Sequence, residues 1–244
     1  MKKRIVKIWG KKYCTIDEIV DSLTVENAQV SRQTVIWSIN DLVKQGKAVR
    51  VGRGVYLIAP KKQFSPVMSA TAKSACSLLA DKFRYLDVTV TDTGFLSEFM
   101  NLQPFSTVVT LEVKKSAVNA ILSAMRKAGF DAYDKNDYPK MQRYITTAQP
   151  ILIRPELAIN PTIAKDCNVR LANIEKTLVD LVCDEDIYGQ YQGEELQNIF
   201  QNATKRYAIN YSQLLKYAGA RKRKETVMQI LQNTDEYQKV RNLL

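Results

Sequence analysis

The most regular pattern of apolar and polar positions in the chain lies between Ser31 and Ile58. Four apolar residues in its first half fall on one helical face, at Val35, Ile39, Leu42 and Val43. Ser31 is a favoured N-cap residue, and Gly46 stands where such a helix would end. Two short apolar runs follow, on either side of Gly52-Arg53-Gly54. The pattern predicts a helix over residues 31–45 and a β-hairpin of strands 48–51 and 55–58 with a cation at its tip.

A shorter helix is predicted just before this one. Thr15 and Glu18 have the spacing of a capping box, in which the hydroxyl and the carboxylate each accept from the other residue's backbone N–H. Apolar residues then recur on one face, at Ile16, Ile19, Val20 and Leu23. Residues 24–30 form the turn, and residues 1–9 are a further helix candidate. Two helices joined by a turn and followed by a basic-tipped hairpin are the sequence form of a winged helix-turn-helix.

In such a unit the N-terminal residues of the second helix meet the edges of the bases. Here these residues are Arg32, Gln33 and Thr34. Because Arg bonds guanine and Gln bonds adenine in bidentate fashion, Arg32 and Gln33 are the sharpest candidates for base contacts. One turn further on, Trp37 and Ser38 are expected to lie away from the apolar face. For Trp37 the sequence favours packing in the core and contact with DNA about equally.

Cations around these elements are candidates for contacts with phosphates. Arg50 lies in the hairpin, and Arg53 at its tip suits a phosphate or the minor groove. Lys11 and Lys12 end a basic N-terminal segment that is either a phosphate contact or a solvated end. A possible second phosphate patch lies near the C-terminus, although most such runs are solvated faces, at Arg221, Lys222, Arg223 and Lys224.

Residues 59–66, which include two prolines, mark a boundary. Beyond them we predict a helix over 67–79, a short helix at 94–100, a helix at 116–128, and strands at 87–91, 107–113, 130–133 and 149–154. From Leu171 the chain is predicted to be helical, with Gly193 opening a second helix and Asn210 capping a third. The predicted fold class is α+β, with a winged helix-turn-helix domain over residues 1–59. Residues 67–244 form a mixed α/β domain with a helical C-terminal part.

The composition of the chain limits the partners and the kinds of site that we expect. Lys and Arg exceed Asp and Glu by 11, and residues 1–58 alone hold eleven basic against five acidic residues. This asymmetry favours an anionic partner, most commonly nucleic acid. The chain has no His, and its four cysteines form no C-x-x-C pair, so zinc fingers and His-based metal sites or catalysis are excluded. Scattered cysteines suit a cytoplasm, and we expect neither a signal peptide nor a membrane span.

The second domain contains no nucleotide-binding motif. Its carboxylates are most simply solvated caps and turn residues, at Asp87, Asp92, Glu98 and Glu112. In an alternative interpretation, Asp87, Asp92 and Glu112 hold a divalent metal, and the chain is a nucleic-acid-processing enzyme with a winged-helix targeting module. A third possibility is a winged helix that binds protein rather than DNA.

The segment VSRQTVIWSINDLVKQGKAVRVGRGVYLI resembles the winged-helix start of AbiEi-type antitoxins. A helix ending in L-x-x-x-G, at Leu42–Gly46, precedes a wing that closes on G-x-Y, at Gly54–Tyr56. The remainder is similar to the C-terminal region of the same group, with IEKTLVDLVCD at residues 174–184 and QGEELQNIF at residues 192–200. The resemblance therefore covers nearly the whole chain.

This resemblance implies the antitoxin of a type IV toxin–antitoxin system. Such antitoxins repress their own operon by binding inverted repeats in double-stranded DNA. They antagonise a nucleotidyltransferase-like toxin without an obligatory stable complex. We therefore expect a cytoplasmic, DNA-binding transcriptional repressor that is not an enzyme, needs no cofactor or metal, and has a cognate toxin as its functional partner.

Overall fold

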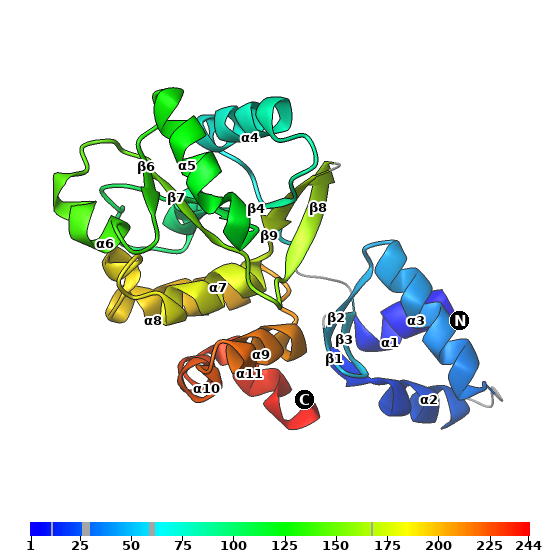
Figure 1. Cartoon of the computed structure of the whole chain (residues 1–244). Helices are drawn as coiled ribbons and strands as arrows, with labels where there is room; N and C mark the ends of the chain where they lie inside the picture. The colour runs from blue at the N-terminus through cyan, green and yellow to red at the C-terminus, as the bar shows by residue number, and fades with distance from the viewer. Residues whose placement is uncertain (11, 26–29, 59–61, 167) are drawn as a thin grey trace. The chain divides into compact units, whose positions relative to one another are not determined.

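The computed structural model describes residues 1–10, 12–25, 30–58, 62–166 and 168–244 and shows a mixed α/β protein (Figure 1). The chain divides into two compact units. Unit 1 consists of residues 1–64, 200–216 and 224–244, and unit 2 of residues 65–199 and 217–223. Both ends of the chain belong to unit 1, which differs from the predicted division into residues 1–59 and 67–244.

The N-terminal part of unit 1 combines helices with a small antiparallel sheet. Its described helices are α1 (Lys2–Trp9), α2 (Ile16–Val25) and α3 (Arg32–Lys44). Its described strands are β1 (Tyr13–Thr15), β2 (Ala48–Gly52) and β3 (Val55–Ile58), in the order β1-β3-β2. The helices and the hairpin predicted from the sequence are confirmed, with small shifts at their ends.

Local capping fixes the helix starts in this part of the chain. The Thr15 N–H donates to Glu18 Oε2 over 2.7 Å, and the Glu18 N–H donates to Thr15 Oγ1 over 3.2 Å. The predicted capping box is therefore present. One buried apolar cluster holds α1, α2, α3 and the sheet together, and it includes Ile5, Ile19, Val35, Ile39 and Tyr56.

The C-terminal helices complete unit 1. They are the end of α8 (Glu194–Arg206), the first part of α9 (Tyr211–Ala220), α10 (Lys224–Gln232) and α11 (Asp235–Val240). Asn210 caps α9 as expected, since its Oδ1 accepts from the Gln213 N–H over 3.0 Å. The Tyr13 hydroxyl on β1 donates to Glu236 Oε2 over 3.0 Å. The last helices thus pack with the first elements of the chain.

Unit 2 is built on a mixed six-stranded sheet with the strand order β6-β7-β5-β4-β9-β8. Its strands are β4 (Val88–Asp92), β5 (Val109–Val113), β6 (Ala132–Asp134), β7 (Ile151–Pro155), β8 (Thr162–Asp166) and β9 (Val169–Ala172). β5 runs antiparallel to β4 and parallel to β7, whereas β4 and β9 are parallel.

The two faces of this sheet differ in polarity, because side chains alternate along each strand. One face packs against α4 (Ala70–Lys82) and α5 (Val118–Lys127) in an apolar cluster that includes Val90, Leu111 and Ile153. The intervening positions point to the other face, where Glu112 and Arg154 are buried with the side chains of α7 (Ile174–Cys183). Figure 1 shows α4 and α5 on one side of the sheet and α7 on the other.

Three predictions in unit 2 need correction. The helix predicted at 67–79 begins at Ala70, because Ser69 caps it by accepting from the Ala72 N–H. The short helix predicted at 94–100 is a 3₁₀ helix over Thr93–Glu98. The chain from Leu171 was predicted to be helical, yet Leu171 ends in β9, and α7 begins only after Asn173 caps it.

Among the described residues, none of the helices is both long and apolar enough to cross a membrane.

Candidate nucleic-acid interface

Helix α3 is fixed at its start by Ser31. The Ser31 Oγ accepts from the Thr34 N–H over 3.2 Å and lies 2.7 Å from Thr34 Oγ1. This cap satisfies one of the N–H groups that a helix start leaves without an intrahelical partner. Arg32, Gln33 and Thr34 are exposed there, as the sequence predicted. The first turn of α3 is therefore an ordered, polar and accessible surface.

Trp37 lies one turn further along α3 and is 69% exposed. Val35 and Ile39 on the opposite face are fully buried. An indole that buries so little of its area contributes little to the core, since hydrophobic stabilisation scales with the apolar area removed from water. The packing interpretation of Trp37 is therefore wrong for the described part of the chain, and the side chain is available to a partner.

Ser38 does not belong to this surface, and its prediction as an exposed site residue is wrong. Its side chain is buried, with only 7% of its area exposed. Ser38 follows Val35 by three positions and precedes Leu42 by four, so it shares their helical face. The small hydroxyl therefore lies on the core side of α3.

Two ion pairs flank α3. Arg32 Nη1 pairs with Asp17 Oδ1 on α2, and Lys2 Nζ on α1 pairs with Asp41 Oδ2 on α3. The hydrogen bond from Lys2 lowers the pKa of Asp41, and the nearby charges of Lys44 and Lys47 act in the same direction. The pair of Arg32 is exposed on both sides, so solvent screens it and it stabilises the fold little. Arg32 can therefore exchange Asp17 for an anionic partner at small cost.

The hairpin β2–β3 carries the next cations. Arg50 donates from Nε to the Gly52 carbonyl over 3.1 Å, which leaves its two terminal nitrogens for other acceptors. The Arg53 N–H donates to Ser212 Oγ over 3.2 Å, while the Arg53 side chain is exposed. Gly54 adopts φ 75°, a conformation that favours glycine, so the tip turns as its sequence predicts. The backbone of the hairpin tip is thus held in place, and the charged side chain of Arg53 is exposed to solvent.

The structure describes one of the two predicted N-terminal cations, Lys12. Lys12 is exposed between α1 and β1, and its carbonyl accepts from the Ile58 N–H over 3.2 Å. Lys11 lies outside the described residues. The basic residues of α1 are all exposed, at Lys2, Lys3, Arg4 and Lys7.

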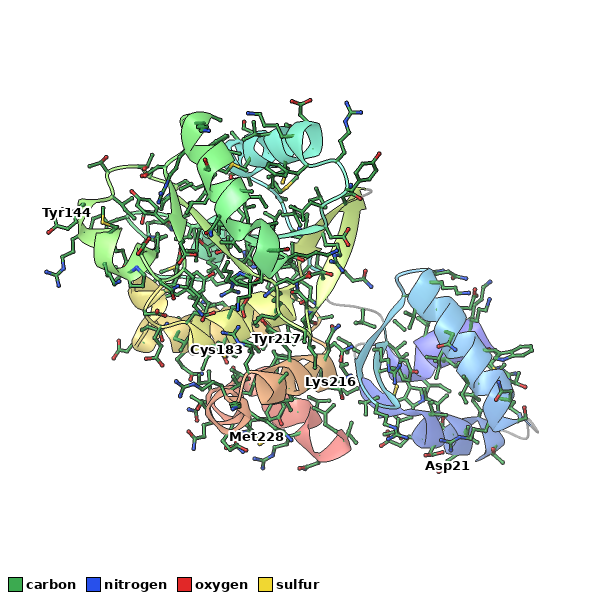
Figure 2. The ribbon with its side chains drawn as sticks, in the orientation of Figure 1. Asp21, Tyr144, Cys183, Lys216, Tyr217 and Met228 are labelled. Carbon is green, nitrogen blue, oxygen red and sulfur yellow. The ribbon has the colours of Figure 1, made fainter. Side chains whose placement is uncertain are left out.

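The four residues of the second predicted phosphate patch do not share one role in the structure. Arg221 donates to Asp180 over 2.5 Å and to Asp184 over 2.9 Å, and its side chain is 13% exposed. It is therefore used within unit 2 and is not a free phosphate ligand. Lys222, Arg223 and Lys224 are exposed beside it. Arg221 also donates to the hydroxyl of Tyr217, which Figure 2 labels, over 3.2 Å.

The carboxylates proposed for a metal site do not converge. Asp92 is a structural cap, whose oxygens accept from the backbone N–H groups of Ser69 and Gly94 over 2.8 and 3.0 Å. In the antiparallel pairing of β4 with β5, Asp92 faces Val109, whereas Glu112 faces Thr89 near the other end. No group of three or more Cys, Asp and Glu side chains among the described residues is arranged to hold a metal ion.

Glu112 belongs instead to a buried ionic network that sequence reasoning missed. Lys176 Nζ donates to Glu112 Oε1 over 2.8 Å and to Asp180 Oδ2 over 2.7 Å. Arg154 joins Glu112, Asp180 and Asp184 from the strand side. Arg221 pairs with Asp180 and Asp184, and Lys135 Nζ donates to Asp184 Oδ1 over 3.0 Å, so the network holds three acidic and four basic groups. The i,i+4 pair Lys176–Asp180 in an otherwise apolar stretch was the sequence signal that could have revealed it.

Residues 34–237 match the model of a family described as a family of unknown function, DUF6577. No curated protein matches the chain. The matched region begins in the first turn of α3 and ends in α11, so it includes parts of both units.

Proposed function

The chain belongs to the DUF6577 family, a family of unknown function, and we propose from its structure that unit 1 contains a winged helix-turn-helix that binds double-stranded DNA. Helices α2 and α3 are the helix-turn-helix in this proposal, and the β2–β3 hairpin is the wing. Helix α3 enters the major groove, and the wing contacts phosphates or the minor groove.

One observation carries the proposal: α3 buries one face in the core and presents the other as a row of groups suited to bases. Arg32, Gln33 and Trp37 are exposed on that face, while Val35 and Ile39 are buried. Arg32 suits guanine and Gln33 suits adenine, because each offers two hydrogen bonds to the base edge. The exposed indole of Trp37 suits the thymine methyl group or a sugar. The surplus of basic residues in the first 58 positions adds the attraction for phosphate.

The biological role we propose is a cytoplasmic transcriptional repressor that acts as the antitoxin of a type IV toxin–antitoxin pair. This role rests on the resemblance of residues 30–58, 174–184 and 192–200 to AbiEi-type antitoxins. In this proposal the chain binds inverted repeats upstream of its own gene. It antagonises a nucleotidyltransferase-like toxin without forming a stable complex with it, and it is not itself an enzyme.

The test is a titration, by fluorescence anisotropy, of a labelled duplex from the region upstream of this protein's own gene, at two salt concentrations and against random competitor. A footprint on the same duplex should show a repeated half-site that survives the competitor. Arg32→Ala should weaken binding to that site by about 1–3 kcal/mol, roughly 5- to 150-fold. Lys12→Ala should weaken all sequences similarly and flatten the salt dependence.

The matched control is Arg170→Ala, which removes an exposed cation from unit 2 and should leave DNA binding unchanged. Equal loss of specific and random binding in Arg32→Ala would show that Arg32 does not read bases. Binding that disappears with competitor or modest salt would reject the repressor. If a footprint is found, the antitoxin role is tested by co-expressing this protein with the neighbouring gene. The role is rejected if the protein does not relieve growth arrest caused by that gene.

A further inference from the structure

A recess of about 420 Å³ lies in unit 2, beside α4 and the segment that leads from α4 into β4. The start of β9 closes its other side, through Asn168 and Val169. This volume is in the range of sites that bind small organic molecules. The recess involves none of the residues assigned above to DNA binding.

The floor of the recess is apolar. It is lined by Met68, Leu79, Phe83, Leu86, Val88 and Val169. Cys76 is also part of the lining, and its thiol is buried and lies 3.9 Å from the sulfur of Met68. An apolar surface left open to water in this way gains free energy when an apolar group covers it.

The polar part of the lining is basic. Lys73 and Arg84 are its charged residues, accompanied by Ser77 and Asn168, and the lining contains no acidic side chain. Within the described part of the chain, neither Lys73 nor Arg84 forms an ion pair, which sets them apart from Arg154, Lys176 and Arg221. Lys73, Ser77 and Ala80 follow one another at helical spacings of four and three, so they lie along one edge of α4, and Arg84 follows just after the end of this helix.

The walls of the recess are held in place by the backbone. The Val88 N–H donates to the Asn168 carbonyl over 2.9 Å, and the Asn168 side-chain amide donates to the Arg84 carbonyl. The segment that carries Arg84 is therefore fastened to β9. A site with fixed walls loses less conformational entropy on binding than one that must first form.

We propose that this recess binds a small amphipathic anion, with its apolar body on the floor and its anionic head at the basic edge that Lys73 and Arg84 provide. The class is an aromatic or aliphatic molecule with one carboxylate, sulfonate or phosphate group. A second copy of this chain is a poor occupant, because the chain carries a net charge of +11 and would bring cations against cations. This proposal does not depend on the proposed binding of DNA by unit 1.

The probe is 8-anilinonaphthalene-1-sulfonate, titrated into the full chain and followed by its fluorescence and by isothermal calorimetry. The neutral relative N-phenyl-1-naphthylamine serves as the ligand without a charge. We expect saturable binding of one sulfonate per chain. Decanoate should displace it, whereas decanol should do so far less well.

Two variants locate the site. Lys73→Gln combined with Arg84→Gln should weaken sulfonate binding by at least about tenfold, because charge-assisted hydrogen bonds are lost, and should leave the neutral relative unaffected. Ala80→Trp fills the recess from its exposed edge and should abolish both. Lys127→Gln, an exposed cation at the end of α5, is the matched control. Circular dichroism and thermal melting check that each variant folds.

The proposal fails if folded Ala80→Trp binds the sulfonate as tightly as the unmodified chain, since the dye would then lie elsewhere. It also fails if the double Gln variant binds it unchanged, or if no saturable binding occurs. DNA binding by the same variants should be unaltered without ligand, so this result is separate from the fate of the proposed function.

Discussion

Arg154 on β7 donates from Nη1 to Oδ2 of Asp184, just beyond the end of α7, over 2.7 Å, and each side chain is only 3% exposed. The contact joins the polar face of the sheet to the helix that covers it. The same guanidinium donates from Nε to Glu112 over 2.9 Å and from Nη2 to Asp180 over 3.0 Å. Arg154 therefore balances three buried carboxylates, together with Lys176, Arg221 and Lys135.

Loss of this arginine should destabilise unit 2 strongly. We expect Arg154→Met to lower the free energy of unfolding by about 3–5 kcal/mol, because it leaves buried carboxylates without compensation. Urea denaturation followed by circular dichroism measures the change. The control is Arg170→Met on β9, whose partners Asp87 and Glu156 lie 3.9 Å away and which is 41% exposed. It should cost less than about 1 kcal/mol. Equal effects would mean that the network does not support the fold.

The network also predicts a dependence of stability on acid pH. Burial alone would raise the pKa of Asp184, but the guanidinium groups of Arg154 and Arg221 outweigh it and lower the pKa well below its usual range. The native state therefore binds fewer protons than the unfolded state, and the stabilisation is present above about pH 4 and lost as the pH falls further. Melting temperatures from pH 6 to pH 3 should fall more steeply in the unmodified chain than in Asp184→Asn. Parallel curves would contradict this assignment.

Trp37 and Ile39 lie two positions apart on α3 and should behave in opposite ways. Trp37→Ala should change the free energy of unfolding by less than about 0.5 kcal/mol, since the indole is mostly exposed. It should weaken binding to a specific duplex by at least about fivefold, the loss of roughly 1 kcal/mol. Ile39→Ala, in the core, should cost about 2–5 kcal/mol of stability. A Trp37→Ala variant that folds and binds the specific duplex normally would refute the contact.

Cys183 at the end of α7 should react slowly with alkylating reagents. Burial raises the pKa of its thiol to about 11, although Arg221 acts in the opposite direction. Its reaction rate with iodoacetamide should therefore rise about tenfold from pH 8 to pH 9, against about threefold for a thiol of ordinary pKa. Mass spectrometry of the peptide that contains Cys183 measures the rate, with urea-unfolded protein as the reference. A threefold rise in the folded chain would show an ordinary thiol.

Predictions from the sequence succeeded where the signal was local. Thr15 and Glu18 form the predicted capping box, and Ser31 caps α3, because such bonds join residues three positions apart. Ser38 was predicted to be exposed because its side chain is polar, although its spacing from Val35 and Leu42 puts it on the buried face of α3, where a small polar residue fits as well as at the surface. The short strand β9 was missed because Leu171 stands directly before a strong helical pattern.

Long-range relations could not be derived from local patterns. The hydrogen bond between Tyr13 and Glu236, which joins the first and last elements of unit 1, spans most of the chain. The pairing of Arg154 with Glu112 depends on β5 and β7 being neighbours in parallel register. Arg221 was grouped with its basic neighbours, yet its charge is directed to Asp180 and Asp184. In each case a side chain's role is set by a partner that only the fold brings near.

Substitutions of Ser31, the N-cap of α3, can distinguish an effect on stability from an effect on DNA binding. Ser31→Ala should lower the free energy of unfolding by about 1 kcal/mol, the usual cost of losing an N-cap. Ser69→Ala, which removes the equivalent cap of α4 in unit 2, should cost about as much and leave DNA binding unchanged. Ser31→Asp keeps a good cap and so should keep stability, but it places a negative charge where we propose that phosphates lie. It should weaken DNA binding most at low salt, as measured by anisotropy, because screening reduces the repulsion as salt rises. Unchanged binding in a stable Ser31→Asp variant would mean that the start of α3 does not approach DNA.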